Sequence, residues 1–368
     1  MDEQCCHPEN EECYLGLRVT KGVSNAPIVN PNLHRQRRTK LSVDEYVDGI
    51  LRGDITILSR AVTLVESLLP AHQDTAQQII ERCLPHAGKS MRIGITGVPG
   101  AGKSTSIDAF GMHLIRQGRK LAVLAIDPSS ERSKGSILGD KTRMEQLARE
   151  KNAFIRPSPS AGSLGGVARK TRETIVLCEA AGFDTIFVET VGVGQSETAV
   201  HSMVDFFLLI QLAGTGDELQ GIKRGIMEMA DGIVVNKADG DNVDKANLAA
   251  SHYRSALRLF PPAESGWKPR VLTYSGYYAL GIKDIWDMVD EYRHMTTDNG
   301  YFRLKRQRQA KWWMYETIND ELRDSFYNNP DVQALIPETE EAVLQDRATS
   351  FIAARRLLEA YFRNAFDS

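Results

Sequence analysis

The sequence predicts an α/β fold in which a mostly parallel sheet carries helices on both faces, with further helices before and after it. Short apolar runs alternate with helical segments from Met91 onward, and only helical patterns remain after about residue 298. This alternation is typical of parallel sheets, because the chain needs a long connection, usually a helix, to return to the start of the next parallel strand. The apolar runs are residues 91–96, 121–126, 153–156, 184–188, 204–211, 232–236 and 270–274.

The segments around the sheet divide the chain into four predicted parts. Residues 1–40 mix Pro, Asn, acidic residues and a basic run, which predicts a disordered tail. Residues 41–90 form a predicted helical module, with a Ser-x-x-Glu capping box at Ser42, a second helix at about 54–69 that Pro70 stops, and a third at 73–83. Residues 91–297 hold the sheet. Residues 298–368 form a helical arm, which we expect to pack on a second copy of the chain as a homodimer or else to cap its own chain.

The composition indicates an ordinary globular protein and excludes some partners. The 368 residues are 42% hydrophobic and 25% charged with a net charge of −3, so no basic field points to nucleic acid. No apolar run reaches the ~18 residues of a membrane span, and the acidic first residues argue against a mitochondrial transit peptide, so we expect a cytoplasmic protein. The five scattered cysteines predict reduced thiols, and the Cys and His residues at 5–13 follow no standard zinc spacing.

A glycine-rich stretch directly after the first predicted strand matches a phosphate-binding pattern. It reads G-x-x-x-x-G-K-[ST] and precedes a predicted helix, which is the context that a P-loop requires. Glycines let the backbone wrap closely around phosphate oxygens, and the helix N-terminus adds the positive end of its dipole. We expect Lys103 to reach the β- and γ-phosphates and Ser104 to bind Mg²⁺. The predicted nucleotide-binding residues here are Gly97, Val98, Pro99, Gly100, Ala101, Gly102, Lys103, Ser104 and Thr105.

A second pattern, at the end of the strand predicted at 232–236, indicates guanine as the base. Asn236, Lys237 and Asp239 match the N-K-x-D element of GTPases. A carboxylate such as that of Asp239 only accepts hydrogen bonds, and guanine offers two donors, N1–H and the 2-amino group, whereas adenine has an acceptor at N1. Lys237 is expected to lie along the base and Asn236 to brace the loop. Backbone N–H groups after the next strand, where GTPases often have Ser-Ala, are expected near guanine O6. They belong to Ser275, Gly276 and Tyr277.

Acidic residues at the ends of two predicted strands are candidate magnesium ligands. Asp127 follows the strand at 121–126 and Glu189 the strand at 184–188, at the edge where parallel sheets bind ligands. Asp140, after a polar loop, is a third candidate. Glu189 begins Glu-Thr-Val-Gly192 in the place of the D-x-x-G of many GTPases, so the Gly192 N–H is expected to contact the γ-phosphate. A helix cap or a solvated loop charge is the alternative role for each acid.

Two loops bear on hydrolysis and switching. Ras-like enzymes place a water-orienting Gln directly after the switch glycine, but here Val193 follows and Gln195 lies further on, so we expect slow hydrolysis that a partner accelerates. The loop from Ala213 to Arg224 carries Lys223, which is expected to reach phosphate or a partner, with a solvated loop as the alternative. We expect the glycine-rich segment 158–166 to serve in packing or in contact with a partner. The catalytic candidates are Lys103, Glu189, Gly192 and Lys223.

Seven stretches of the chain carry a resemblance to a known family: GVPGAGKST, AIDPSS, GDKTRM, RPSPSAGSLGGVA, VETVGVGQSE, AGTGDELQGIKRGI and VNKAD. Together they resemble the MeaB/ArgK-type P-loop GTPases, chaperones of cobalamin-dependent acyl-CoA mutases such as methylmalonyl-CoA mutase. The resemblance covers residue 41 to the end and implies a P-loop NTPase fold, a third switch at the loop of Lys223, and a dimer through the C-terminal helices. It also implies a GTP-timed role in loading, protecting or reactivating the mutase, with cobalamin reached only through that partner. The Mg²⁺ contacts that it implies are Ser104, Asp127, Asp140 and Glu189.

Three other functions are alternatives to a GTPase switch. A small-molecule or protein kinase of the transport-kinase type is the main alternative, but Asp239 selects guanine and no catalytic-loop signature is evident. A nickel metallochaperone would need Cys or His ligands near the nucleotide domain, and Cys178 has none beside it. A signal-recognition-type GTPase would usually have a Met-rich or amphipathic partner domain, which the C-terminal arm does not resemble.

Overall fold

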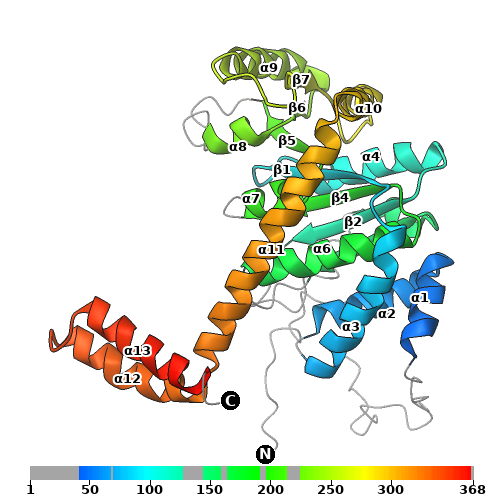
Figure 1. Ribbon diagram of the computed structural model, residues 1–368. Coiled ribbons are helices and arrows are strands. Elements are labelled where there is room, and N and C mark those ends of the chain that lie inside the picture. Colours follow the sequence, from blue (N-terminus) through cyan, green and yellow to red (C-terminus); the bar gives the residue numbers. More distant parts are fainter. Residues whose placement is uncertain are drawn as a thin grey trace, which may run out of the picture. The chain divides into compact units, whose positions relative to one another are not determined.

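The computed structural model describes residues 41–67, 69–126, 144–158, 164–190, 196–213 and 224–365. Its elements lie in one unit, Ser42–Ser368, built on a seven-stranded sheet in the order β3-β2-β4-β1-β5-β6-β7 (Figure 1). Every pair of neighbouring strands is parallel, so the predicted α/β fold is confirmed. The strands are β1 (Met91–Gly97), β2 (Leu121–Ile126), β3 (Ala153–Ser158), β4 (Thr185–Thr190), β5 (Phe206–Leu212), β6 (Gly232–Asn236) and β7 (Arg270–Thr273).

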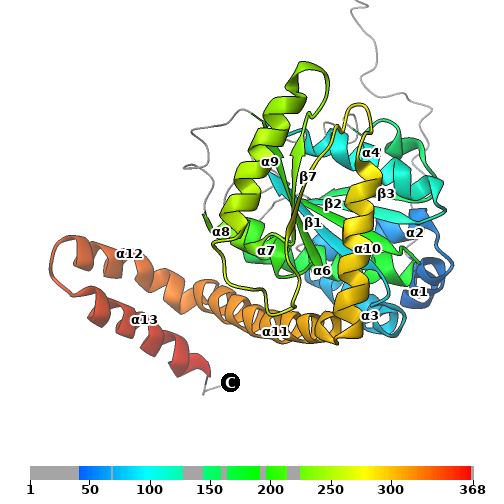
Figure 2. The ribbon, with the colours of Figure 1, turned by 90° about the horizontal axis from the view of Figure 1, so that it is seen from above.

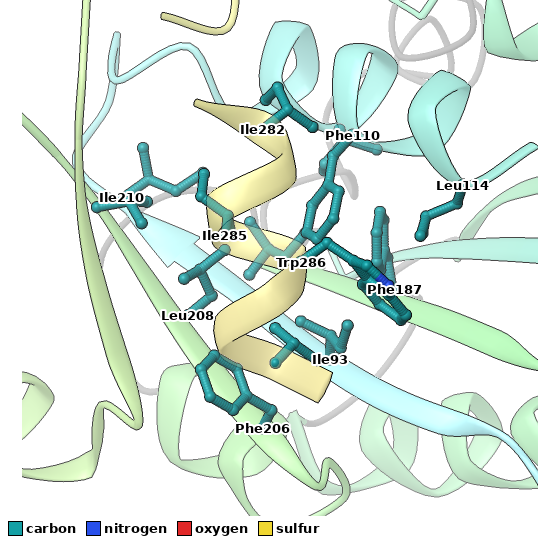
Figure 3. Close-up of a cluster of buried hydrophobic side chains, with 14 of the residues drawn as sticks. Ile93, Phe110, Leu114, Phe187, Phe206, Leu208, Ile210, Ile282, Ile285 and Trp286 are labelled. Carbon is teal, nitrogen blue, oxygen red and sulfur yellow. The ribbon is translucent and has the colours of Figure 1, made fainter. Parts of the chain in front are cut away.

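The inner strands are buried on both faces, which is why the sequence shows them as continuous apolar runs. Every residue of β2 and β4 is buried. On one face, α4 (Lys103–Arg116) and α10 (Ile282–Asp298) share a core with the strands, and Figure 3 shows their side chains gathered there. The Phe110 ring of α4 lies 5.1 Å from that of Phe187 and 6.0 Å from that of Trp286. These aromatic contacts fix α4, and with it the phosphate-binding loop, against the sheet.

Helices α6 (Leu164–Ala180) and α7 (Ser196–His201) pack against strands of the sheet, and three N-terminal helices pack on α6 (Figure 1). They are α1 (Val43–Leu51), α2 (Ile55–Glu66) and α3 (Pro70–Cys83). The predicted capping box is present: Glu45 N donates to Ser42 Oγ at 3.2 Å, and Ser42 N donates to the Glu45 carboxylate at 2.7 Å. The prediction that Pro70 stops the second helix is wrong. Helix α2 already ends at Glu66, and Pro70 begins α3, because proline suits the first helical turn, where its missing N–H is not needed.

The remaining elements connect these layers or extend the chain. Helix α9 (Val243–Leu257) packs on β6 and β7, and α8 (Arg224–Met229) on β5. Short 3-10 turns lie at η3 (Leu84–His86), η5 (Leu147–Arg149) and η6 (Gly240–Asn242). After α10 comes the long helix α11 (Tyr301–Tyr327), followed by α12 (Pro330–Leu344) and α13 (Ser350–Ala365), which run side by side (Figure 2). Among all helices in the described ranges, none is long and apolar enough to cross a membrane.

Buried charges join α11 to the amino end of the sheet. The Arg306 guanidinium donates to both carboxylate oxygens of Asp205, at 2.8 and 2.7 Å, and to the carbonyl oxygens of Gly88 and Ser90, each at 2.6 Å. Arg92 donates twice to Glu179, each bond 2.9 Å long. Burial alone would raise the pKa of both carboxyls, but the charges and hydrogen bonds of Arg306 and Arg92 hold the pKa of Asp205 and Glu179 below their ordinary values. This set of four side chains is called the amino-end network below.

Candidate functional site

The phosphate-binding pattern lies where β1 meets α4, between the carboxyl ends of β4 and β5. Gly97 ends β1 so close to β5 that a Cβ atom there would lie 2.2 Å from the Ile210 carbonyl oxygen. Gly102, with φ +81°, is the N-cap residue of α4 and provides no side-chain cap. The first N–H groups of α4 are therefore not taken by a capping side chain, which suits binding of an anion.

Lys103 begins α4 and turns back over the loop. Its ammonium donates to the carbonyl oxygen of Gly97 at 2.9 Å and to that of Val98 at 3.4 Å. Burial lowers the pKa of Lys103 from its ordinary value, and the nearby charges of Glu189 and Glu197 oppose this shift. The folded chain thus holds a desolvated cation at the phosphate-binding loop, where a phosphate oxygen would be a strong acceptor.

The Asn236 side chain connects the phosphate-binding loop to the two predicted base loops. It ends β6 and is 3% exposed. Its Nδ2 donates to the Ala101 carbonyl oxygen at 2.7 Å. Its Oδ1 accepts from Lys237 N at 2.7 Å and from Gly276 N at 2.9 Å. One amide group therefore joins three of the segments that the sequence assigned to the nucleotide.

The predicted base-binding residues differ in exposure. Lys237 is exposed and has the left-handed φ of +60°, and its carbonyl oxygen accepts from Asn242 Nδ2 at 2.7 Å. Asp239 is half-buried. Ser275 is fully buried, whereas Tyr277 is 81% exposed. A ligand can therefore reach Lys237, Asp239 and Tyr277. Ser275 shapes the loop through its Oγ, which accepts a hydrogen bond from Tyr278 N at 3.2 Å.

The candidate metal ligands are only partly within the described residues. Glu189 is 3% exposed near the end of β4, in register with Ile95 of β1, and its charge acts on Lys103. Ser104 lies one residue after Lys103 in α4. Asp127, Asp140, Gly192 and Lys223 lie outside the described residues. No group of three or more His, Cys, Asp or Glu residues that could hold a metal ion occurs in the part of the chain that the structure describes.

Two residues of the site region were missed by sequence reasoning. The Ser106 and Tyr274 hydroxyl oxygens lie 2.6 Å apart, and both side chains are buried. Ser106 falls two residues after Ser104 and Tyr274 directly precedes Ser275, so both adjoin recognised motifs. Closeness to a motif was the only signal, because a single hydroxyl residue forms no pattern of its own.

Two cavities lie at other parts of the described chain, away from these loops. One of about 500 Å³ lies beside the edge strand β3 and α2, and is lined by Phe154, Arg156 and Ser59 among others. Another of about 590 Å³ lies beside the start of β1 and α10, lined by Lys89, Arg119 and Arg293 among others.

Over most of its length the chain is similar to proteins of one family. A family model described as methylmalonyl Co-A mutase-associated GTPase MeaB matches residues 58–331. A probable GTPase of Mycobacterium tuberculosis is 52% identical over 320 residues, 86% of this chain and 95% of the relative. GTPase ArgK of Escherichia coli is 46% identical over 323 residues, 88% of this chain and 98% of the relative. A crystal structure described as LAO/AO transport system kinase is similar with a TM-score of 0.70 and 39% identity, over 87% of this chain and 99% of that one.

Proposed function

The chain belongs to the MeaB family of GTPases, and on that basis we propose that it is a GTP-binding and GTP-hydrolysing switch that assists a cobalamin-dependent acyl-CoA mutase. Methylmalonyl-CoA mutase is the first candidate partner, because the family description names it. In this role the switch gates cofactor loading and protects or reactivates the mutase. Cobalamin is reached through the mutase alone.

The observation that carries the nucleotide part of this proposal is the Asn236 side chain. It holds the Ala101 carbonyl of the phosphate-binding loop and the Lys237 and Gly276 amides of the base loops at once. A ligand that spans these loops has phosphates at one end and a base at the other. Asp239 then selects guanine, because its carboxylate accepts from N1–H and the 2-amino group.

The phosphate end has its own set of proposed roles. Lys103 binds the β- and γ-phosphate oxygens, and the N–H groups at the start of α4 bind them as well. The Ser104 hydroxyl and the Glu189 carboxylate are oxygen donors, which Mg²⁺ prefers, so these residues fit the ion, with Asp127 and Asp140 as further proposed ligands. When bound, Mg²⁺ neutralises charge on the β- and γ-phosphates. Gly192 and Lys223 are proposed contacts of the γ-phosphate and of the partner.

Calorimetric binding of GDP and ADP with Mg²⁺ tests the nucleotide assignment. We expect wild type to bind GDP at least ~100-fold more tightly than ADP, and Asp239→Ala to lose this preference, because a site built on hydrogen bonds rejects the wrong base strongly. Asp241→Ala is the matched control, since Asp241 is an exposed carboxylate on the same loop. Equal binding of the two nucleotides by wild type would contradict the proposal.

The fate of the phosphate separates the switch from the transport-kinase alternative. We expect slow release of inorganic phosphate from GTP by the protein alone and faster release with methylmalonyl-CoA mutase. Transfer of the phosphate to an acceptor molecule, with none released to water, would favour a kinase.

We also propose that the arm forms a homodimer. Its helices expose large apolar side chains, which monomers rarely leave open in such number. They include Trp312, Met314, Tyr315, Ile318, Leu322, Leu344, Phe351, Ile352, Leu358 and Phe362. Sedimentation of wild type and of Phe351→Ser tests this, with Phe351 chosen because it is 86% exposed. A dimer that dissociates in the variant supports the proposal, and a wild-type monomer contradicts it.

A further inference from the structure

The Ser106 hydroxyl makes two hydrogen bonds beside the candidate site, and the proposed nucleotide contacts do not include it. It is in the first turn of α4 and is 5% exposed. Its Oγ donates to the Gly102 carbonyl oxygen at 2.8 Å and lies 2.6 Å from the Tyr274 hydroxyl. Because a serine hydroxyl has one hydrogen, the Tyr274 O–H is the donor in the second bond. The start of α4 is thus tied to the end of β7.

Tyr274 extends this tie to the base loop. Its backbone N donates to the Val235 carbonyl oxygen at 3.0 Å, and its own carbonyl oxygen accepts from Ala238 N at 3.0 Å. Ala238 lies between Lys237 and Asp239 in the N-K-x-D element. One tyrosine therefore holds the guanine-reading loop through its backbone and the phosphate-binding helix through its hydroxyl. The side chain is 2% exposed, and burial raises its pKa, which keeps the hydroxyl protonated as a donor.

The position of Ser106 also explains why residue 276 is glycine. A Cβ atom on Gly276 would lie 2.9 Å from Ser106 Oγ and 3.4 Å from Ser106 Cα. The φ angle of Gly276 is not in the left-handed region, so its backbone conformation would suit other residues. Only space requires glycine here. In this chain the glycine leaves room for the hydroxyl pair beside it.

We propose that Ser106 and Tyr274 are positioning residues that fix the spacing between the phosphate-binding loop and the guanine-binding loop, with Gly276 leaving room for their hydrogen bond. The inference rests on the proposed binding of a guanine nucleotide. Both side chains are buried, so their proposed action is indirect: Ser106 acts through the Gly102 carbonyl and Tyr274 through Ala238. A ligand that bridges both loops gains affinity from loops already held at the right distance, whereas a ligand that contacts one loop gains nothing.

Tyr274→Phe tests the hydrogen bond, with GDP and pyrophosphate as the two ligands, each with Mg²⁺. GDP spans both loops, and pyrophosphate contacts the phosphate-binding loop alone. We expect GDP affinity to fall about 5–10-fold and pyrophosphate affinity to stay within about twofold. Tyr292→Phe is the control, because Tyr292 is another buried tyrosine of the same core, and its GDP affinity should match wild type. Equal losses for both ligands, or no loss for GDP, would overturn the inference.

Gly276→Ala and Ser106→Ala test whether residue 276 must lack a side chain to leave room for Ser106 Oγ. Gly276→Ala should weaken GDP binding about tenfold, because the added methyl group pushes on Ser106 Oγ. Removing that oxygen makes the room, so the double variant should bind GDP as Ser106→Ala does. Losses that simply multiply in the double variant would refute the coupling.

The same series separates this inference from the proposed function. If wild type prefers GDP to ADP and the variants bind GDP as tightly as wild type does, the guanine site stands and the positioning role is refuted. If wild type does not prefer GDP to ADP, the guanine site itself is refuted, and the positioning role with it.

Discussion

At the amino end of the sheet, arginine and carboxylate side chains form paired hydrogen bonds, whereas at the carboxyl end the Lys103 ammonium has hydrogen bonds to backbone carbonyl oxygens of its own loop. Arg306 and Asp205 form two hydrogen bonds, as do Arg92 and Glu179. At the other end, the Lys103 ammonium donates to backbone carbonyl oxygens, and Asp239 is half-buried in its loop. Removing one partner of a buried charge pair is strongly destabilising, whereas a desolvated charge with a shifted pKa beside a loop is a candidate ligand contact.

Both ends of the sheet are held by contacts between residues far apart in the chain. Arg306 reaches Asp205 across 101 residues and so fastens α11 to the sheet. At the carboxyl end, Asn236 reaches Ala101 across 135 residues, and Ser106 and Tyr274 are 168 residues apart. The amino-end network holds no residue proposed to bind the nucleotide, so changes there should alter stability and leave binding unchanged. Changes to the proposed nucleotide contacts at the carboxyl end should mainly alter binding.

Arg306→Ala is the largest expected effect. It leaves the Asp205 carboxylate buried without its guanidinium partner, so the free energy of unfolding should fall by about 3–5 kcal/mol. Urea unfolding measures this change. GDP affinity of the folded fraction should stay within about twofold, since the two sites share no partners.

If Arg306→Ala does not fold, Arg306→Lys keeps the charge and loses the paired hydrogen bonds, and should give a smaller loss of stability with normal GDP binding. A folded variant with normal stability, or with strongly weakened GDP binding, would break the comparison between the two ends.

Lys103→Met should weaken GDP binding without lowering the stability of the nucleotide-free protein, the opposite of Arg306→Ala. GDP affinity should fall about 10–100-fold, because a charge-assisted hydrogen bond contributes about 1.5–3 kcal/mol. The nucleotide-free variant should melt at the same temperature as wild type or higher. The reason is that burial lowers the pKa of Lys103, so the charged ammonium makes folding less favourable at neutral pH. Thermal unfolding with and without GDP and Mg²⁺ checks both parts, and a nucleotide-free variant much less stable than wild type would contradict them.

The fold was predictable because its signals are local. Buried parallel strands such as β2 and β4 appear as continuous apolar runs, and the capping box of α1 lies within four residues. The error at Pro70 has a local cause too: proline can end one helix or begin the next, and only the packing of α3 decides which.

The site was predictable only where its residues are contiguous. The phosphate-binding stretch and Asn236 to Asp239 are short motifs whose chemistry can be read from spacing. The Ser106–Tyr274 bond joins residues 168 positions apart, and the fold alone brings them together. The amino-end network escaped prediction for the same reason, because isolated Arg and Asp residues are most often solvated.

The amino-end network should also give the stability a dependence on pH. The folded-state pKa values of Asp205 and Glu179 lie below their ordinary values of 3.8 and 4.5. Their contribution is therefore complete above those ordinary values and is lost as the pH falls through the lowered ones. Asp231, whose pKa burial raises despite Lys305 nearby, contributes with the opposite sign.

Urea unfolding of wild type and Asp205→Asn between about pH 7 and pH 3 isolates this effect. The stability difference between the two should be constant at neutral pH and should shrink as the pH falls below the ordinary value of 3.8. A difference that stays constant through that range would mean that the Asp205 carboxylate is not the group that Arg306 stabilises.

Arg308→Ala should have the smallest effect and sharpens the comparison within one helix. Arg308 lies two residues after Arg306 on α11 and also has a carboxylate partner, Glu264, at 2.6 Å. Both of these side chains are more than half exposed, so water and salt screen the pair, and the melting temperature should stay within about 1 °C of wild type. A shift of several degrees would show that α11 depends on charge pairs at any depth. An unchanged value beside a destabilised Arg306→Ala would show that burial decides which pair holds the helix to the sheet.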